Sequence, residues 1–205
     1  MSNAIQALAG AFIAMMLLAA PAFGANVDFR NPAFAPVNGP TSIPVGAAEF
    51  CKTHLGECGP SARPIDVEAL TEAGWQQLIA INDHVNTSIV PVTDAELYQV
   101  AEFWTYPDGR GDCEDFALEK RRLLIANGWN PSTLLMTVVR QQNGEGHAVL
   151  MVRTDRGDLV LDNQDGRVLL WTDTPYEFVK RQSQADSRKW VGIADFRAPL
   201  YTASY

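Results

Sequence analysis

The chain has few of the residues on which several common functions depend. Its 205 residues include 16 Lys or Arg against 24 Asp or Glu, giving a formal net charge of −8. Binding a phosphate backbone relies on Lys and Arg that release counterions, so this balance argues against nucleic acid as a partner. Only three cysteines and three histidines are present, so thiol or imidazole chemistry has few candidates. No internal repeat is seen, and the length suits one globular core.

The N-terminal segment lacks charge altogether. No charged side chain occurs in the first 25 residues, and residues 5–20 are almost entirely apolar. An apolar stretch followed by small residues is typical of a secretory signal peptide. We therefore predict that residues 1–25 are removed, by cleavage after Ala22, Gly24 or Ala25, leaving a periplasmic or secreted protein. Because no Lys or Arg precedes the apolar stretch, an uncleaved membrane anchor is the alternative.

Residues 26–64 are rich in Pro, Gly and Ala, and we expect an irregular lead-in to a domain at 65–205. The lead-in contains a cysteine pair, Cys51 and Cys58. In an oxidising compartment this pair is interpreted as a disulfide that closes a short loop. A metal site that also uses His54 would have only three ligands at an unusual spacing. Two free thiols are the remaining alternative.

Two helices are predicted before the middle of the chain. Apolar residues recur at helical spacing over 66–85, which indicates an amphipathic helix. Thr93 and Glu96 form a capping-box pattern that opens a second helix, expected to run to about Trp104.

A third helix and three strands follow. Cys113 is expected to begin the helix, and Gly128 supplies a C-terminal stop. Alternating apolar residues then predict strands at 134–139, 147–152 and 159–161, most simply an antiparallel meander.

Three residues suited to thiol catalysis lie at the ends of these elements: Cys113 at a helix start, His147 at a strand start and Asp162 just after a strand. A helix N-terminus and a nearby imidazolium favour the thiolate form of cysteine. The histidine would accept and return the proton, and the aspartate would fix its tautomer. His84 lies within the first predicted helix, and His54 lies inside the cysteine loop. Taken singly, such a cysteine or histidine is more often a structural residue.

The surrounding sequence resembles a known family, the bacterial transglutaminase-like cysteine proteinases. The segments that carry the resemblance are Gly111–Ala117 (GDCEDFA), Gly146–Leu150 (GHAVL), Leu161–Asn163 (LDN), Asp94–Tyr98, Phe103–Pro107 and Lys180–Ser183, within a region from about Phe50 to Trp190. The resemblance implies an α+β fold with a papain-like or transglutaminase-like core, in which a helix-borne cysteine packs on an antiparallel sheet. It also implies that Cys113, His147 and Asp162 form the catalytic triad.

The resemblance further implies partners. Members of the family include periplasmic proteases that cut surface adhesins, and some are calcium-dependent and sequestered by an inner-membrane receptor. A protein substrate at the cell surface or in the envelope, and such a regulatory receptor, are therefore expected. The chain departs from the adhesin-cleaving members in its shorter loop between Trp104 and Gly111 and in its cysteine pair.

The nucleophile candidate is bracketed by Asp112, Glu114 and Asp115. Like charge disfavours a thiolate, so these carboxylates need an offset. They could simply stabilise the helix N-terminus while pointing away from the sulfur. Calcium, which prefers several carboxylate oxygens, is the other explanation, and the resemblance places a calcium site at these three positions.

An oxyanion hole would use the Cys113 backbone N–H and a second donor. Side chains at Asn82, Gln99 and Trp104 are candidates, and the sequence does not choose among them. The favoured function is an exported cysteine peptidase. Transamidation by the same triad, or a non-catalytic peptide-binding module on this fold, are the alternatives.

Overall fold

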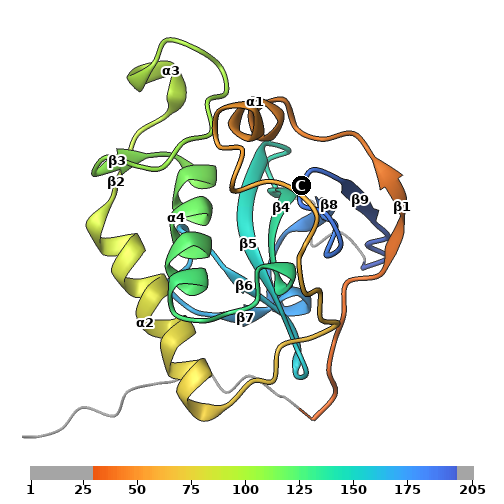
Figure 1. The fold of residues 1–205 in the computed structure, drawn as a ribbon. Coiled ribbons are helices and arrows are strands. Elements are labelled where there is room, and N and C mark those ends of the chain that lie inside the picture. The colour runs from red at the N-terminus through yellow and green to blue at the C-terminus, as the bar shows by residue number, and fades with distance from the viewer. Residues whose placement is uncertain (1–29, 198–205) are drawn as a thin grey trace, which may run out of the picture.

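A seven-stranded sheet organises residues 30–197, the part of the chain that the computed structural model describes (Figure 1). The predicted signal peptide lies outside these residues. The strand order is β1-β9-β8-β4-β5-β6-β7, and every pairing in this sheet is antiparallel. The strands span Val37–Thr41 (β1), Leu134–Arg140 (β4), Gly146–Thr154 (β5), Gly157–Leu161 (β6), Leu169–Leu170 (β7), Glu177–Gln182 (β8) and Trp190–Ile193 (β9).

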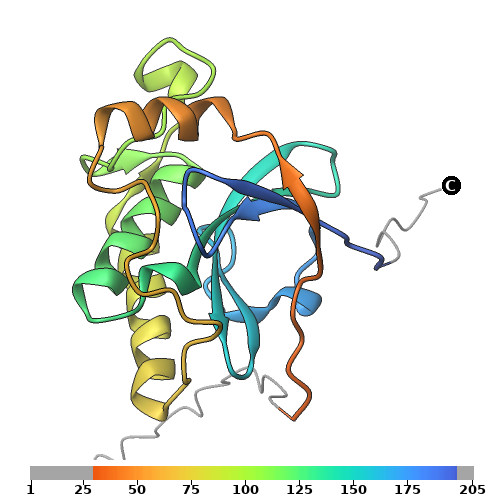
Figure 2. The ribbon, with the colours of Figure 1, turned by 45° about the vertical axis from the view of Figure 1, so that its right-hand side comes forward.

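Helices cover one face of the sheet. Figure 1 shows the two longest helices side by side on this face, and Figure 2 shows α1 running across one end of the molecule. The helices are α1 (Val45–Thr53), α2 (Glu72–Ser88), α3 (Asp94–Leu97) and α4 (Cys113–Ala126), with short 3-10 helices η1 (Pro131–Thr133) and η2 (Trp171–Asp173). A small parallel pair, β2 (Val90–Pro91) and β3 (Arg110–Gly111), holds the chain on either side of α3.

Side chains that alternate along the strands fill two cores. On β5, Leu150 and Val152 join the core beneath α2 and α4, whereas Val149 and Met151 join a second core on the other face. Successive side chains of a strand point to opposite faces, so this alternation sorts each strand residue to one core or the other. The α+β class is confirmed, as is the antiparallel meander of β4, β5 and β6.

Two predicted helices differ from those observed. The first begins at Glu72 rather than near residue 66, because the Thr71 side chain caps it by accepting from the Gly74 N–H. The second has the predicted capping box but spans only Asp94–Leu97. Gln99 has a positive φ of 60°, which ends this helix far short of Trp104.

The helix that carries Cys113 begins and ends as expected. Gly128 adopts a φ of +93°, the Gly128 N–H donates to Ile125, and the Trp129 N–H donates to Leu124. These bonds form the helix-ending motif for which glycine is preferred.

The segment expected to be irregular contains two regular elements, β1 and α1. β1 pairs with β9 at the edge of the sheet, and Phe50 of α1 is buried in the main core. Cys51 and Cys58 are joined by a disulfide, with Cα atoms 5.5 Å apart. That bond removes the thiolates that the alternative metal site with His54 requires. Within residues 30–197, no helix combines the length and apolar character needed to cross a bilayer.

Gly46 lies where α1 meets the buried ring of Trp104. A Cβ added at this position would stand 2.2 Å from Trp104 Cδ1, far inside van der Waals contact. We predict that Gly46→Ala lowers the free energy of unfolding by roughly 1–3 kcal/mol, because overpacking forces the indole or the helix to move. Urea unfolding measures the change.

Gly56→Ala is the matched control, since a Cβ there meets nothing within 4 Å. Equal stability of the two variants would contradict the close packing of α1 on Trp104.

Candidate active site

Cys113 is the first residue of α4, and Asp112 before it has extended backbone. The parallel pairing of β2 with β3 fixes the path of the chain into α4, because the Val92 N–H donates to the Gly111 carbonyl just before the helix. Gly111 allows the chain to pass close to Asp115, where a Cβ would lie 2.5 Å from Asp115 Oδ2. The thiol therefore stands at a helix N-terminus, where the backbone N–H groups favour negative charge.

His147 and Asp162 are hydrogen-bonded, with 2.8 Å between His147 Nε2 and Asp162 Oδ1. The pairing of β5 with β6 places Leu150 opposite Leu161. Continued by one residue, this register puts Asp162 opposite Val149, so His147 and Asp162 are diagonal rather than opposite. An offset of two residues keeps both side chains on one face of the sheet.

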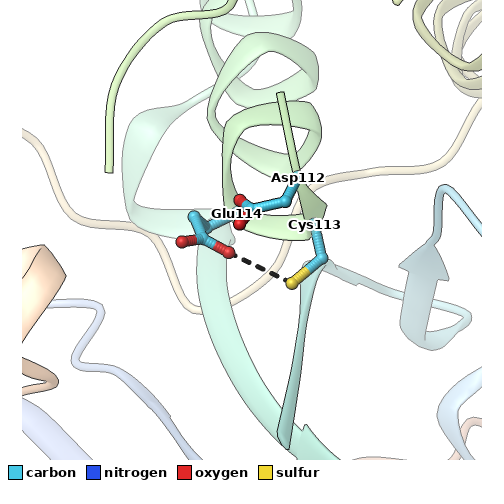
Figure 3. Close-up of side chains that lie close together, drawn as sticks. All are labelled: Asp112, Cys113 and Glu114. Atoms are coloured by element: carbon cyan, nitrogen blue, oxygen red, sulfur yellow. Dashed lines mark hydrogen bonds between the residues drawn. The ribbon is translucent and has the colours of Figure 1, made fainter. Parts of the chain in front are cut away.

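The cysteine reaches this pair from the helical side of the sheet. The ladder between β5 and β6 stops at Leu150, and the Ala148 N–H donates to the Cys113 sulfur at 3.4 Å. The thiol thus lies at the backbone of the residue that follows His147. Figure 3 shows its other hydrogen bond among the described residues, to Glu114 Oε2 at 3.1 Å. The described hydrogen bonds of this thiol do not include one to the imidazole of His147.

The environment of Asp162 determines which ring nitrogen of His147 carries the proton. Burial alone would raise the pKa of Asp162, but hydrogen bonds from His147, the Gln164 N–H and Tyr176 outweigh it and lower that pKa below its usual value. An ionised Asp162 accepts from the Nε2–H of His147, which leaves Nδ1 as the atom able to accept a proton. The Gln164 side-chain amide lies 3.5 Å from Nδ1.

Tyr176 is a site residue that the sequence analysis missed. Its hydroxyl donates to Asp162 Oδ2 at 2.5 Å. Gln164, whose backbone N–H donates to Asp162 Oδ1 at 3.0 Å, was also missed. Neither residue belongs to a pattern of helical or strand periodicity that would have distinguished it.

The thiol is not activated by the helix terminus alone. Burial raises the pKa of Cys113 above its usual value, and the neighbouring Glu114 carboxylate raises it further. Burial, followed by the charge of Asp112, raises the pKa of Glu114 to about 9. The thiol therefore acts as a hydrogen-bond donor to Glu114 in this arrangement, contrary to the expected thiolate.

The acidic residues form two overlapping groups. Asp112 and Glu114 lie with Cys113, and Asp112 and Asp115 lie with Asp94; within each group one ligand atom per residue lies within 4.8 Å of the others. Asp94 was not among the predicted metal ligands, because its position in the first turn of the predicted second helix already explained it.

Each carboxylate of the second group uses one oxygen and leaves one free. Asp94 Oδ2 accepts from the Phe103 N–H, Asp115 Oδ1 from the Thr105 N–H at 2.9 Å, and Asp112 Oδ2 from the Asp94 N–H at 3.3 Å. The other oxygens are buried and receive no hydrogen bond from residues 30–197. Burial is the main cause that raises the pKa of Asp94, and it raises that of Asp115 to about 7. Three clustered carboxylates, each with one buried oxygen that lacks a hydrogen bond from the described residues, suit a hard cation.

Two of the three candidates for a second oxyanion donor have other partners. Asn82 Nδ2 donates to the Gly166 carbonyl at 3.1 Å, and the Trp104 indole donates to Glu102 at 2.6 Å. Gln99 lies just after the short helix α3, and its backbone has a positive φ of 60°. Gln164 is the side-chain amide that the structure places beside His147.

Comparison with known protein families identifies the family of this chain. The family model for the bacterial transglutaminase-like cysteine proteinase matches residues 37–198. The chain belongs to this family. It is therefore a cysteine peptidase with a transglutaminase-like fold. Among curated proteins, none matches the chain.

Similar solved structures are those of LapG from Legionella pneumophila. The calcium-bound form is 25% identical, covers 60% of this chain and 70% of its own, and has a TM-score of 0.48. An EGTA-treated form is 26% identical, with shares of 60% and 68% and a TM-score of 0.48. A further LapG structure is 28% identical, with shares of 52% and 62% and a TM-score of 0.45. Because all three TM-scores are below 0.5, membership of the family rests on the sequence match.

This cysteine peptidase buries a lysine beneath its candidate site. Lys120 lies two turns after Cys113 on α4, is 0% exposed, and its ammonium has no hydrogen-bond partner within residues 30–197. Burial lowers the pKa of Lys120 from 10.5 to about 7, with Asp162 acting in the opposite direction. A buried ammonium without a hydrogen bond destabilises the fold in its charged form.

We predict that Lys120→Met raises the free energy of unfolding at pH 7 by about 1–4 kcal/mol. Between pH 7 and pH 10 the unfolded chain binds more protons at Lys120 than the folded chain, because the folded pKa is about 7 against 10.5. This residue's destabilising effect is thus complete below pH 7 and is lost as the pH rises towards 10.5.

Urea unfolding at pH 7 and pH 10 measures both effects. Lys52→Met, which removes an exposed ammonium, is the control. If the two variants have the same pH dependence, the lowered pKa of Lys120 is wrong.

Proposed function

We propose that this protein is an exported cysteine peptidase that cleaves a protein substrate through Cys113, His147 and Asp162. The hydrogen bond between His147 and Asp162, with the Cys113 sulfur held at the adjacent Ala148 N–H, is the observation that carries the proposal. Nucleophile, base and orienting carboxylate thus come from α4, β5 and the end of β6.

Each residue has a defined role in the proposed reaction. Asp162 holds the Nε2–H of His147, so Nδ1 accepts the thiol proton when Cys113 attacks the scissile carbonyl. The imidazolium then returns that proton to the leaving amine, and an acyl thioester remains on Cys113. Water, deprotonated by His147, hydrolyses the thioester and frees the thiol. The backbone N–H at the start of α4 stabilises the oxyanion in both halves.

Calcium is proposed as a resident ion held by Asp94, Asp112 and Asp115. The fit rests on the three buried carboxylate oxygens that receive no hydrogen bond from the described residues. The predicted set of Asp112, Glu114 and Asp115 is thereby extended to Asp94, and Glu114 remains beside the thiol. When bound, the ion would supply positive charge that offsets these carboxylates beside the nucleophile.

The proposed location is the periplasm or the exterior, after removal of residues 1–25. An envelope or cell-surface protein is the proposed substrate, and an inner-membrane receptor is the proposed regulator. The Cys51–Cys58 disulfide supports an oxidising compartment, because disulfides persist there and are rare in the cytosol.

Removal of the nucleophile tests the catalytic assignment. We predict that Cys113→Ala abolishes cleavage, lowering the rate by at least about 10³-fold, because no other group in the site forms the thioester. Comparing envelope proteomes of the parent strain and a Cys113→Ala strain measures this, and a fragment missing from the variant identifies the substrate.

The same strains distinguish hydrolysis from transamidation. A labelled amine is added to each, and its incorporation into envelope proteins is measured. Incorporation that depends on Cys113 without any cleavage would overturn the peptidase assignment in favour of acyl transfer to amines. No difference between the strains in either assay would argue for a peptide-binding module.

Chelation tests the ion. We predict that calcium at about 100 times its Kd raises the Tm of the mature protein by roughly 5 °C or more over that in EGTA. Asp94→Asn is expected to lose most of this increase, because it removes one ligand charge. Differential scanning calorimetry measures both.

Asp83→Asn on the exposed side of α2 is the matched control and should keep the full increase. A Tm that is the same in calcium and in EGTA for the unsubstituted protein would remove the ion from the proposal while leaving the triad.

A further inference from the structure

The carboxylate of Asp162 is held from two sides. Its Oδ1 accepts from His147 Nε2 at 2.8 Å and from the Gln164 N–H at 3.0 Å. Its Oδ2 accepts from the Tyr176 hydroxyl at 2.5 Å. The Tyr176 ring also lies 5.4 Å from the imidazole of His147, centroid to centroid, at an angle of 51°. One tyrosine thus contacts both partners of the hydrogen-bonded pair.

We propose that Tyr176 is a positioning residue for catalysis, which fixes the Asp162 carboxylate and shields the His147–Asp162 hydrogen bond from water. The inference rests on the proposed function of this pair, and adds to it the residue that holds the pair in place. Tyr176 does not touch the reacting thiol in a described hydrogen bond, so its effect is exerted through Asp162 and His147.

The direction of the Tyr176 hydrogen bond is determined by its surroundings. Asp162 has a lowered pKa, so it is ionised and can only accept. Burial and the hydrogen bond to Asp162 raise the pKa of Tyr176, which keeps its hydroxyl protonated as a donor. A hydrogen bond to an ionised group contributes more than one between neutral groups.

Shielding follows from the positions of the rings and of the carboxylate. His147 is 4% exposed and Asp162 is 3% exposed, whereas Tyr176 is half-buried at the surface of the second core. The tyrosine ring, 5.4 Å from the imidazole, is placed to exclude water from this side of the pair. Exclusion of water strengthens the electrostatic interaction between an imidazolium and a carboxylate.

An arginine near the end of the described chain holds the segment that presents Tyr176. Arg197 Nη2 donates to the Tyr176 carbonyl, and Nη1 donates to the Trp171 carbonyl at 2.7 Å. The guanidinium also lies over the Trp171 ring, 4.5 Å from its centroid, and pairs with Asp195 at 2.7 Å. A lysine ammonium lacks the rigid planar fork that presents two separate nitrogens to the two carbonyls.

Tyr176→Phe separates the hydroxyl from the ring. We expect kcat for hydrolysis of p-nitrophenyl acetate, a generic acyl donor, to fall about tenfold with KM unchanged. Tyr176→Ala, which also removes the shielding ring, should lower kcat further. The NMR signal of the His147 Nε2 proton should shift in both variants, because this proton reports the hydrogen bond to Asp162.

Tyr106→Phe is the matched control. It removes another tyrosine hydroxyl whose pKa is raised by burial and by a nearby carboxylate, that of Glu57, away from the His147–Asp162 pair. The control should keep the kcat and the His147 proton signal of the unsubstituted protein. Equal losses in the two phenylalanine variants would overturn the proposal, because they would indicate a general effect on the fold.

A double-mutant cycle distinguishes positioning from a structural role. In an Asp162→Ala background, Tyr176→Phe should cause no further loss of kcat, since the hydroxyl has nothing left to position. In the otherwise unsubstituted protein, Arg197→Lys should cause part of the loss of kcat seen in Tyr176→Phe. Added to Tyr176→Phe, it should cause no further loss of kcat. Independent, additive losses in these cycles would contradict the proposal even if one variant folds poorly.

The two proposals fail in different ways. If Cys113→Ala hydrolyses p-nitrophenyl acetate as fast as the unsubstituted protein, the proposed catalytic function is wrong. If Cys113→Ala is inactive while Tyr176→Phe keeps full kcat and an unshifted His147 proton, the role of Tyr176 alone is wrong.

Discussion

A thiol that must ionise is buried beside several carboxylates, and this electrostatic conflict explains much of the arrangement around Cys113. Burial and Glu114 both raise the pKa of the thiol. The start of α4 opposes them only in part, because the charge at a helix N-terminus is fractional. In the proposed mechanism, the additional positive charge comes from the His147 imidazolium, held by Asp162, and from the proposed ion at Asp94, Asp112 and Asp115. The negative charge of the acidic residues is thus explained when it is considered together with the positive charge that offsets it.

The end of the sheet also brings Cys113 of α4 next to the strand that carries His147. His147 and Asp162 share a face with Val149, opposite to the face that α4 covers. The ladder between β5 and β6 ends before Ala148, and at this open position the sulfur of Cys113 reaches the backbone of β5. The site therefore lies where the sheet stops, and the rest of the sheet can be a well-packed core on both faces.

Much of this site could be predicted from local sequence. Cys113, His147 and Asp162 each lie at the end of an element, and ends of elements are visible in hydrophobic periodicity. Asp94 was not predicted as a site residue because a capping box already explained its position. The Phe103 N–H donates to Asp94 only because α3 ends early, and this early end depends on one positive φ at Gln99. Tyr176 escaped because it is 14 residues from its partner Asp162, and no local pattern records such a contact. The diagonal register of His147 and Asp162 depended on the position of one turn, which composition alone does not settle.

The Cys51–Cys58 bond has a consequence for the redox chemistry of the enzyme. The chain has three cysteines, and two of them are bonded to each other, so Cys113 is the single free thiol. A cysteine oxidised to the sulfenic acid is commonly protected from further oxidation when a second thiol condenses with it. This chain holds no such resolving thiol. In an oxidising compartment, recovery of an oxidised nucleophile would depend on a small-molecule thiol or on another protein.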